Sequence, residues 1–577
     1  MTEKKWQLLP PISQDLISKF PEINRLVLQL LHNRGLQDQK SIDDFLLPNY
    51  DDQVLDPFLF TDMAKAVARI FLAVNRREKV MVFGDYDADG VCASVILFRT
   101  FKSLGLDVDV RIPFRETEGY GLNKKIAQQI IDQGFKLVIT VDCGISNVEE
   151  IALFNQHGVD VIVTDHHEEP PQLPPALAII NPAVKTSGYP FKFLCGAGVA
   201  FKLVQAIIKN QNRDDVPLKL PEGFDKWLLD LVALATVGDI VSLLGENRVL
   251  VKYGLLVLSK TKKLGLQELI NAVNNHKGKF NTEYLGWRLV PRINAAGRIN
   301  HASVAFDLLS ASTPEEAKRL VQLLENNNQV RQQLTEKILK AAEEQVAPQL
   351  EKNKILWAIG EGWPAGILGL VAGRLADRYH RPALVIGFDN DKYVGSGRSI
   401  EEFDITWALT QNAEFLWRFG GHSRACGFTI MGEGNLVAFQ NRLTLLAEEK
   451  LVGVNLAPTL KIEAEIKLSD IGWDLVDELE NFEPYGENND KPLLAAYNLT
   501  IEQLQTVGSD GQHLKVLVSQ EERSTHLHKL IGFSFGDWCA RLKVGEKIDI
   551  VFELGVNEWN GNRELQLKIV DLKLSKQ

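Results

Sequence analysis

From Lys79 to Pro182, short apolar runs alternate with longer amphipathic stretches. The apolar runs are rich in β-branched residues, which predicts strands at 79–85, 108–112, 136–142, 159–164 and 176–182. The stretches between them predict helices at 91–105, 123–134 and 146–158. Because parallel strands require crossover helices, this alternation predicts an α/β fold with a doubly wound parallel sheet.

A long helix is predicted next. The sequence T-P-E-E at 313–316 is typical of a helix start, with Thr313 as N-cap and Glu316 placed for a capping box. Apolar positions at helical spacing continue to about Val346, and at 1.5 Å per residue such a helix spans on the order of 50 Å. We interpret it as a connector between two lobes, because strand and helix patterns resume at 354–360, 365–380, 382–388 and 392–399 and predict a second α/β lobe.

From about Pro458 onward the pattern changes to strand-like runs at 460–466, 492–508, 513–519, 528–535 and from 546. A set of five or so antiparallel strands suits a small barrel such as an OB-fold, which often holds single-stranded nucleic acid. We therefore predict five parts, which are an N-terminal extension packing on the first lobe (1–75), a first α/β lobe (76–312), a connector helix (313–347), a second α/β lobe (348–454) and a C-terminal β-barrel (455–577).

Composition restricts the class of protein. The 577 residues include 75 acidic and 64 basic ones, for a formal net charge of −11, which excludes binding of a polyanion through a global positive field. The N-terminus lacks the apolar core of a signal peptide, and no stretch approaches the roughly 18 apolar residues of a membrane span, so we expect a cytoplasmic protein without membrane contact. The 5 cysteines form no C-x-x-C pair, so any metal must be held by Asp and His.

Acidic and histidine residues follow three of the predicted strands. They are Asp85, Asp87 and Asp89 after the first, Asp142 after the third, and Asp165, His166 and His167 after the fourth. In parallel sheets ligands bind beyond the carboxyl ends of the strands, so these side chains are predicted to meet at one edge. Crowded carboxylates repel one another unless cations neutralise them. Taken alone, the D-x-D-x-D pattern is equally consistent with a solvated turn or a calcium loop.

Asp239 adds another acid, because it interrupts the apolar, helix-like run at 231–248. A buried acid needs a partner, and a satisfied helix-end cap is the alternative to a metal ligand. Oxygen-rich sites with histidine and no thiolate favour manganese or magnesium. The carboxylates are more than one ion requires, so we expect two ions about 4 Å apart, which activate a water and steady the leaving oxygen of a phosphoryl displacement.

The motifs GDYDADG (84–90), VDCGIS (141–146), TDHHE (164–168) and ATVGDIVSL (235–243), in this order, resemble the DHH phosphoesterase superfamily. NAAGRI (294–299), GSGRS (395–399) and GGH (420–422) resemble the DHH-associated lobe of that superfamily. The predicted terminal barrel resembles the OB domain of its RecJ family, the single-strand-specific 5′→3′ exonucleases.

The resemblance implies a metal centre. Its implied ligands are Asp87, Asp89, Asp142, His166 and Asp239, with Asp85 as an additional one. The cofactors it implies are two Mn²⁺ or Mg²⁺ ions. His167 is then the catalytic residue that faces the scissile phosphate, and Asp165 orients a neighbour rather than binding metal.

The resemblance also implies groups that bind substrate. Arg115, Ser396 and Arg398 lie where RecJ proteins bind the terminal 5′-phosphate, and Arg298 touches the strand nearby. Gly420 and Gly421 let backbone amides approach a phosphate, and His422 donates to it. A surface salt bridge is the alternative for a single arginine, and a bare G-G-H is weak evidence.

One motif departs from the family, because Gly362-Trp363-Pro364 stands where RecJ-like chains often carry Gly-Trp-His. A proline cannot bind phosphate through its side chain or its nitrogen.

The function implied is a metal-dependent 5′→3′ exonuclease on single-stranded DNA, acting in DNA repair and recombination as a monomer. A helicase and a single-strand binding protein are candidate partners. One alternative is a phosphodiesterase of the same superfamily acting on short RNA or cyclic dinucleotides, although such enzymes generally lack an OB-fold. The other is a catalytically silent DNA-binding scaffold, although silent relatives lose the ligand aspartates that this chain keeps. RNA against DNA preference, processivity and the physiological metal do not follow from the sequence.

Overall fold

The computed structural model describes residues 4–115, 118–119, 121–211, 219–273, 279–520, 527–559 and 562–575. The chain forms two compact units. The lobe unit comprises Val54–Val241 and Val249–Leu456, and the barrel unit comprises Met1–Gln53, Ser242–Arg248 and Ala457–Gln577. Among the helices of the described residues, none is long and apolar enough to cross a membrane.

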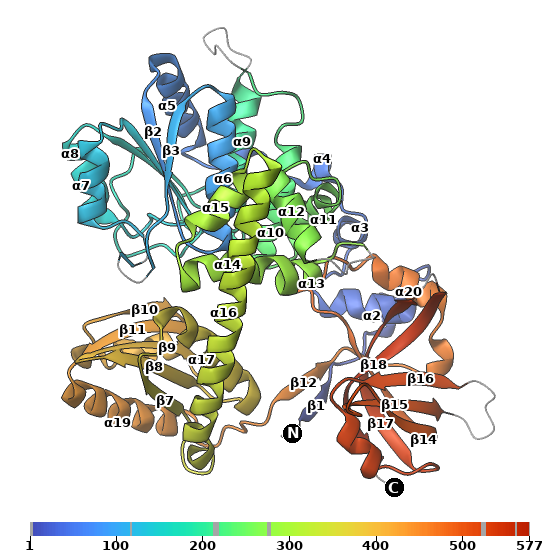
Figure 1. Cartoon of the computed structure of the whole chain (residues 1–577). Coiled ribbons are helices and arrows are strands. Elements are labelled where there is room, and N and C mark those ends of the chain that lie inside the picture. The colour runs from blue at the N-terminus through green and yellow to red at the C-terminus, as the bar shows by residue number, and fades with distance from the viewer. Residues whose placement is uncertain are drawn as a thin grey trace. The chain divides into compact units, whose positions relative to one another are not determined.

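The lobe unit contains a five-stranded parallel sheet in the order β3-β2-β4-β5-β6 (Figure 1). Its strands are β2 (Lys79–Gly84), β3 (Asp107–Arg111), β4 (Leu137–Val141), β5 (Asp160–Thr164) and β6 (Ala178–Ile180). The predicted parallel sheet is therefore confirmed. From β2 the chain moves to one side to form β3 and then to the other side to form β4, so the strand order reverses between β2 and β4. Sheets of this kind bind ligands at such a reversal, beyond the carboxyl ends of the strands.

Helices cover both faces of this sheet (Figure 1). Helices α7 (Lys124–Asp132) and α8 (Val148–Gln156) pack on one face, where Met81 and Phe83 lie in their shared core. On the other face lie α5 (Met63–Arg76), α6 (Ala88–Ser103) and α9 (Gly196–Asn210), with α10 (Leu229–Gly238) against α6 and α9. Parallel strands buried on both faces read as continuous apolar runs, which is the pattern of this sequence.

The lobe unit contains further helices besides those that cover this sheet. They are the short helices η1 (Pro57–Leu59) and η2 (Lys226–Leu228), then α11 (Gly245–Leu258), α12 (Leu264–Ala272), α13 (Thr282–Tyr284), the π-helix η3 (Leu285–Leu289), α14 (Val290–Ile299) and α15 (Ser303–Ser310). The first residues of α11 belong to the barrel unit and the rest to the lobe unit.

The predicted long helix is observed as α16 (Pro314–Val346), with 33 residues. The hydroxyl of Thr313 accepts from the backbone N–H of Glu316 at 3.3 Å, as the N-cap pattern predicts. α16 packs against α12, α14 and α15 in its first part and against α17 and β7 in its last part. It therefore joins the two lobes of the lobe unit.

The second lobe is built on a mixed five-stranded sheet in the order β10-β11-β9-β8-β7. Its strands are β7 (Leu356–Glu361), β8 (Ala383–Asp389), β9 (Lys392–Arg398), β10 (Arg418–His422) and β11 (Ala425–Met431). Its helices are η4 (Ala347–Gln349), α17 (Ala365–Tyr379), α18 (Ile405–Thr410), η5 (Ala413–Phe415) and α19 (Glu433–Lys450). α17 and α16 share a core on one face, and α18 and α19 share a core on the other.

The barrel unit contains the predicted barrel. Its strands are β14 (Leu493–Val507), β15 (His513–Ser519), β16 (His528–Gly532), β17 (Lys547–Trp559) and β18 (Asn562–Leu574). They pair in the order β14-β15-β16-β18-β17, and β17 closes the ring on β14. We predicted antiparallel strands, but β16 and β18 are parallel. Strand directions can alternate only around an even ring, so a closed ring of five must contain a parallel pair.

The N-terminal residues join this barrel unit, which corrects the prediction that residues 1–75 pack on the first lobe. Strand β1 (Lys5–Leu8) pairs with β12 (Thr459–Ile462), and apolar residues of the N-terminal helices lie in the same core as the barrel strands. The end of the predicted extension, from Val54, belongs to the lobe unit, where η1 and α5 pack on α9. The physical reason is that an amphipathic pattern shows a buried face and not the element that buries it.

The remaining elements of the barrel unit are α1 (Gln14–Lys19), α2 (Arg25–Asn33), α3 (Gln39–Leu46), α4 (Tyr50–Gln53), β13 (Ala464–Glu465), η6 (Leu468–Asp470), α20 (Trp473–Glu480) and η7 (Gly536–Ala540). Arg248 ties the segment Ser242–Arg248 to them, because its guanidinium donates to the carbonyls of Phe45 at 2.9 Å, Asn481 at 2.7 Å and Phe482 at 2.8 Å.

Candidate metal centre

The first acidic loop folds tightly at the end of β2. Asp87 is the N-cap of α6, and its Oδ1 accepts from the amides of Asp89 at 2.9 Å and Gly90 at 3.1 Å. A Cβ on Gly90 would lie 2.6 Å from the carbonyl oxygen of Asp85, so the loop requires a glycine there. Asp85 and Asp89 are buried. This tight loop therefore directs buried carboxylates toward the edge of the sheet.

Asp89 is held by the start of another helix. Its two carboxylate oxygens accept from the amides of Gly196 at 2.6 Å and Ala197 at 2.7 Å, in the first turn of α9. Amides at a helix N-terminus stabilise an anion. Nevertheless, burial and the charge of Asp87 raise the pKa of Asp89 to about 7. The protein alone does not compensate this carboxylate fully.

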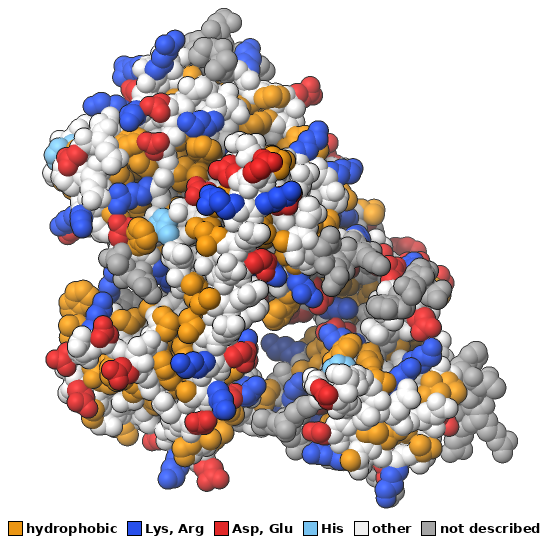
Figure 2. All heavy atoms as spheres, in the orientation of Figure 1, with side chains coloured by type: hydrophobic (Ala, Val, Ile, Leu, Met, Phe, Trp, Pro, Cys, Tyr) orange, Lys and Arg blue, Asp and Glu red, His pale blue; other side chains and the backbone are white. Residues whose placement is uncertain are grey.

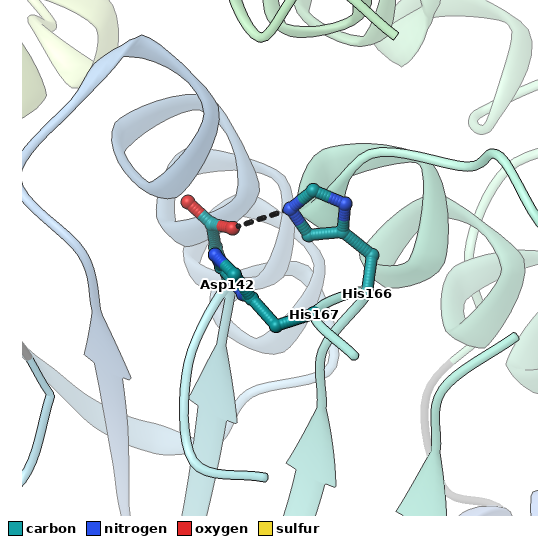
Figure 3. Close-up of side chains that lie close together, drawn as sticks. All are labelled: Asp142, His166 and His167. Carbon is teal, nitrogen blue, oxygen red and sulfur yellow. Dashed lines mark ion pairs between the residues drawn. The ribbon is translucent and has the colours of Figure 1, made fainter. Parts of the chain in front are cut away.

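His166 lies among three carboxylates. Its Nε2 is 3.1 Å from Oδ1 of Asp142 (Figure 3), 3.6 Å from Oδ2 of Asp239 and 3.7 Å from Oδ2 of Asp89. Burial and the neighbouring His167 lower the pKa of His166 to about 4, so the ring is neutral near pH 7. Within the described residues this Nε2 is buried without a hydrogen-bond partner, and a neutral imidazole nitrogen is a metal ligand.

Asp165 does not face the carboxylates. Its Oδ1 lies 2.7 Å from Nδ1 of His167 and accepts from the amide of His166 at 2.7 Å, and its Oδ2 accepts from the amide of Ile145 at 3.0 Å. Burial raises the pKa of Asp165, but the hydrogen bond from His167, the charges of His167 and His166 and the hydrogen bond from Ile145 together outweigh burial and leave the pKa below its ordinary value. Asp165 therefore fixes the ring of His167, as the sequence predicts.

Asp239 ends α10 and lies beside His166. An ionised carboxylate is disfavoured at the C-terminal, negative end of a helix. Burial and the charges of Asp89 and Asp87 raise its pKa well above the ordinary value. The helix-end cap that the sequence left open does not explain a carboxylate in this position.

These side chains form three groups in which the ligand atoms lie within 4.8 Å of one another. The groups are Asp85, Asp87 and Asp142, then Asp89, His166 and Asp239, and finally Asp142, His166 and His167. Asp142 and His166 are each shared by two groups. Burial and the charges of Asp89 and Asp87 raise the pKa of Asp142 well above its usual value. Among the residues that the structure describes, Oδ1 of Asp85 is buried without a hydrogen-bond partner. Such a cluster fits divalent cations, and its many oxygens suit magnesium or manganese.

Three arginines converge from separate elements of the lobe unit. Arg115, after β3, lies over the ring of Tyr86 with its guanidinium carbon 4.9 Å from the centroid. Arg298 of α14 donates to the carbonyl of Gly366 at 3.0 Å, and burial together with the charges of Arg115 and Arg398 lowers its pKa to about 9. This proximity identifies an arginine cluster, defined here as Arg115, Arg298 and Arg398.

The second lobe supplies Arg398 and its neighbours. Arg398 of β9 donates to the carbonyl of Gly397 at 2.9 Å and to Oγ of Ser396 at 3.3 Å. A Cβ on Gly369 of α17 would lie 3.0 Å from both the Arg398 guanidinium and Oγ of Ser396. The helix therefore leaves room for both side chains.

The G-G-H segment lies on the exposed strand β10. The ring of His422 stacks toward that of His167 with 6.4 Å between their centroids and 15° between their planes. A Cβ on Gly421 would lie 2.3 Å from the carbonyl oxygen of Ala425, so this strand pairing requires a glycine. His167 thus faces His422 of the second lobe and Arg298 donates to Gly366 of that lobe, whereas the carboxylates and His166 form the cluster at the edge of the sheet.

Three family models match the chain. They are the DHH family N-terminal domain over residues 79–236, the DHHA1 domain over 352–449 and the RecJ OB domain over 462–571. The single-stranded-DNA-specific exonuclease RecJ of Bacillus subtilis is 36% identical over 100% of this chain and 71% of that protein. The RecJ of Haemophilus influenzae is 30% identical over 96% of each chain. This chain belongs to the RecJ family.

Solved RecJ structures agree with this assignment. The crystal structure of RecJ from Thermus thermophilus in complex with Mn²⁺ has a TM-score of 0.83 and 28% identity, covering 99% of this chain and 80% of that one. An exonuclease RecJ bound to manganese has a TM-score of 0.60 and 33% identity, covering 70% of this chain and 99% of that one. The predicted fold class, with two α/β lobes and an OB barrel, is confirmed.

Pro364, where this RecJ-family chain departs from Gly-Trp-His, is the N-cap of α17 and makes no side-chain cap bond. The preceding Trp363 packs tightly, because a Cβ on Gly360 would lie 2.0 Å from its indole. The departure therefore leaves the packing of this helix start intact.

Sequence reasoning missed three groups that position the RecJ carboxylates. Gly196 and Ala197 bind Asp89, and Oδ1 of Asn294 accepts from the amide of Ala88 at 2.7 Å, at the first residue of α6. One signal was available, because Gly-Ala-Gly opens a helix at 196–198, and helix N-termini bind anions. For Asn294 the sequence held no signal of its partner.

Proposed function

We propose that this chain is a 5′→3′ exonuclease that hydrolyses the phosphodiester bonds of single-stranded DNA with two divalent cations, Mn²⁺ or Mg²⁺. The observation that carries the proposal is the carboxylate cluster at the strand-order reversal, in which adjoining ligand groups share Asp142 and His166. It is supported by the membership in a family of proteins named single-stranded-DNA-specific exonucleases and by RecJ structures in complex with Mn²⁺ and Mg²⁺.

Each cation has its own ligand set in this proposal. Asp85, Asp87 and Asp142 hold one ion. The other ion is held by Asp89, His166 and Asp239, and Asp142 lies between the two sets. Such a pair of ions, when bound, supplies activation of a water and neutralisation of charge on the attacking and leaving oxygens of an in-line displacement.

The other residues position the substrate. Asp165 fixes the ring of His167, which donates to the scissile phosphate, and His422 donates from the facing lobe. Gly420 and Gly421 let the backbone of β10 approach the same phosphate, because neither carries a side chain and a Cβ on Gly420 would meet nothing within 4 Å.

The 5′ direction follows from the arginine cluster. Arg115, Ser396 and Arg398 bind the terminal 5′-phosphate, and Arg298 contacts the strand beside it. Arginine is suited to this role because its planar fork grips phosphate with two hydrogen bonds. Burial, followed by the like charges of Arg115 and Arg398, lowers the pKa of Arg298, so an anion beside these guanidiniums is the complementary ligand.

We propose a division of labour along the chain. Residues 76–312 and 348–454 carry the chemistry, 313–347 connect them, and the barrel at 455–577 grips the strand further along. Acidic and basic side chains are interspersed on the face drawn in Figure 2, so the strand is bound by local basic groups. We propose that the protein acts as a monomer in the cytoplasm, in DNA repair and recombination, with a helicase and a single-strand binding protein as partners.

Digestion of end-labelled single strands tests this function. We expect Mn²⁺-dependent release of mononucleotides from the 5′ label and not from the 3′ label, and no release with chelator. Asp89→Ala should lower the rate by more than about 10³-fold and leave strand binding in place, because several kcal/mol of transition-state charge stabilisation depend on the ions. Asp377→Ala, an exposed change on α17, is the matched control. Release from the 3′ end, or parent-like activity of Asp89→Ala, would overturn the proposal.

Release from cyclic dinucleotides or short RNA in place of DNA would indicate the phosphodiesterase alternative. Strand binding without any release would indicate the silent scaffold.

A further inference from the structure

Ile240 adopts a backbone conformation that its side chain disfavours. Its φ is 57°, in the left-handed region, which costs about 1–2 kcal/mol and is rare for a β-branched residue. Glycine or asparagine is usual just beyond the end of a helix. Burial does not offset this cost, because Ile240 has an exposed fraction of 70%. Ile240 directly follows Asp239, so this strained, exposed residue borders the metal centre.

A second irregularity lies against the same end of α10. The π-helix η3 packs on α10, and a Cβ on Gly286 would lie 3.7 Å from Cγ1 of Val237. π-helical turns are rare and frequent at functional sites. Leu285 and Leu289 of η3 are buried, whereas Trp287 between them has an exposed fraction of 76%.

Neither feature is explained by stability. An indole left in water forgoes a burial stabilisation on the order of several kcal/mol. Ile240 and Trp287 are large apolar side chains that belong to elements meeting at one end of one helix. Apolar surface that stays exposed at the end of the helix leading to Asp239 points to a binding surface.

The neighbouring charges indicate the kind of ligand. Arg288, beside Trp287, is exposed, whereas Arg292 donates to the carbonyl of Arg288 at 2.7 Å and pairs with Glu325, which leaves Arg288 as the basic group beside the indole. From there α14 leads to Arg298 of the arginine cluster. An exposed aromatic ring beside an exposed arginine suits a single nucleic-acid strand, because a base stacks on the ring while a phosphate faces the guanidinium.

The spacing places the contact along that strand. Trp287 and Arg298 are 11 residues apart, which is about 16 Å at 1.5 Å per helical residue. Stacked bases are about 3.4 Å apart, so this distance corresponds to about five nucleotides. We propose that Trp287 is a stacking site for one base within about five nucleotides of the 5′ end and that Ile240 is the apolar edge of this site. The inference rests on the proposed exonuclease function.

Abasic substrates test this site. The substrates are 5′-phosphorylated oligothymidines, either intact or with one abasic site at position 2, 3, 4, 5 or 6. The variants are Trp287→Ala, Trp287→Phe and, as matched control, Trp227→Ala, an exposed tryptophan on η2 at the opposite end of α10. The measured quantity is kcat/KM, and thermal unfolding verifies that each variant is folded.

On the intact strand we expect Trp287→Ala to lower kcat/KM by about 5-fold to 150-fold, the equivalent of 1–3 kcal/mol per stacked base. Trp287→Phe should keep most of the activity and Trp227→Ala all of it. At one position, an abasic site should lower the kcat/KM of the parent by a similar factor. The same abasic site should not lower the kcat/KM of Trp287→Ala any further.

The stacking site would be overturned if Trp287→Ala lowered kcat/KM by the same factor, relative to the parent, on every abasic substrate. It would also be overturned if Trp287→Ala digested the intact strand as fast as the parent does. If Trp287→Ala does not fold, Trp287→Phe replaces it in the test. The stacking site is overturned if Trp287→Phe lowers kcat/KM on the intact strand as much as the most harmful abasic position lowers it in the parent. A parent that does not digest the intact strand would instead overturn the proposed function, so the two failures are distinguishable.

Discussion

A Cβ atom on Gly196 would lie 2.6 Å from the Cβ of Asp142. Buried atoms at that separation must move apart, so Asp142 keeps its place only because residue 196 has no side chain. The amide of the same glycine donates to Asp89 at 2.6 Å. Gly196 therefore positions two of the proposed metal ligands without being a ligand itself.

Gly196→Ala should disturb the metal centre although every proposed ligand is retained. We expect Mn²⁺ affinity to fall by about 10-fold to 100-fold, the usual effect of displacing the groups that orient ligands, and hydrolysis to fall with it. Gly198→Ala is the matched control, because its Cβ would meet Leu194 at 3.4 Å and Sγ of Cys195 at 3.7 Å, which are ordinary van der Waals distances. Isothermal titration calorimetry with Mn²⁺ measures the metal affinity of the two variants. Equal affinities in the two variants would contradict the positioning role.

Asp239→Asn removes one charge from the carboxylate cluster. Burial and the charges of Asp89 and Asp87 raise the pKa of Asp239, so near pH 7 its ionised form destabilises the metal-free protein. We expect the variant to be more stable than the parent in chelator, by on the order of 1 kcal/mol, the free energy of about one pKa unit. With Mn²⁺ the order should reverse, because the variant has lost a ligand. Thermal unfolding in both conditions measures the change, with Asp377→Asn as control, and a less stable variant in chelator would refute the argument.

Arg398→Ala should impair digestion of 5′-phosphorylated strands more than that of 5′-hydroxyl strands. Loss of a charge-assisted hydrogen bond of about 1.5–3 kcal/mol corresponds to about 10-fold to 150-fold in the ratio of the two kcat/KM values. Arg442→Ala, an exposed arginine on α19, should leave the ratio unchanged. Equal losses on both substrates would make Arg398 a general backbone contact.

Lys515 and Lys529 line a hollow of about 280 Å³ on the barrel, together with Ile531 and Leu565. If the barrel grips the strand there, replacing both lysines by alanine should weaken binding to long oligothymidine. It should also make the slope of log affinity against log salt shallower by about 1.4, because each phosphate contact on a single strand contributes about 0.7. Fluorescence anisotropy measures the slope. The exposed pair Lys461 and Lys467, changed in the same way, is the control, and an equal effect of the two pairs would place the grip elsewhere.

Ile240→Gly should separate stability from activity. Glycine adopts a φ of 57° without strain, so the variant should unfold at a temperature no lower than the parent, because about 1–2 kcal/mol of strain is removed against about 0.5–1 kcal/mol of added chain entropy. Digestion of single strands should nevertheless slow, because the apolar edge of the stacking site is lost. A variant that is clearly less stable, or fully active, would show that Ile240 has another role.

The sequence by itself determined the parallel sheet and the meeting of Asp85, Asp142 and His166. Strand periodicity is a local property, and all strands of a parallel sheet point the same way. Residues that directly follow such strands therefore reach one edge wherever the strands lie in the order. The Thr313 cap of α16 was predictable for the same reason, since donor and acceptor are three residues apart.

Only the tertiary structure decided which faces meet. The partner of α2 in the barrel unit lies more than 400 residues away along the chain, and many small packing energies choose that partner together. The approach of Gly196 to Asp142, and that of Gly286 to Val237 near the end of α10, depend in the same way on how whole helices pack. No short stretch of sequence contains both halves of such a contact, so the pattern of one half cannot specify the other.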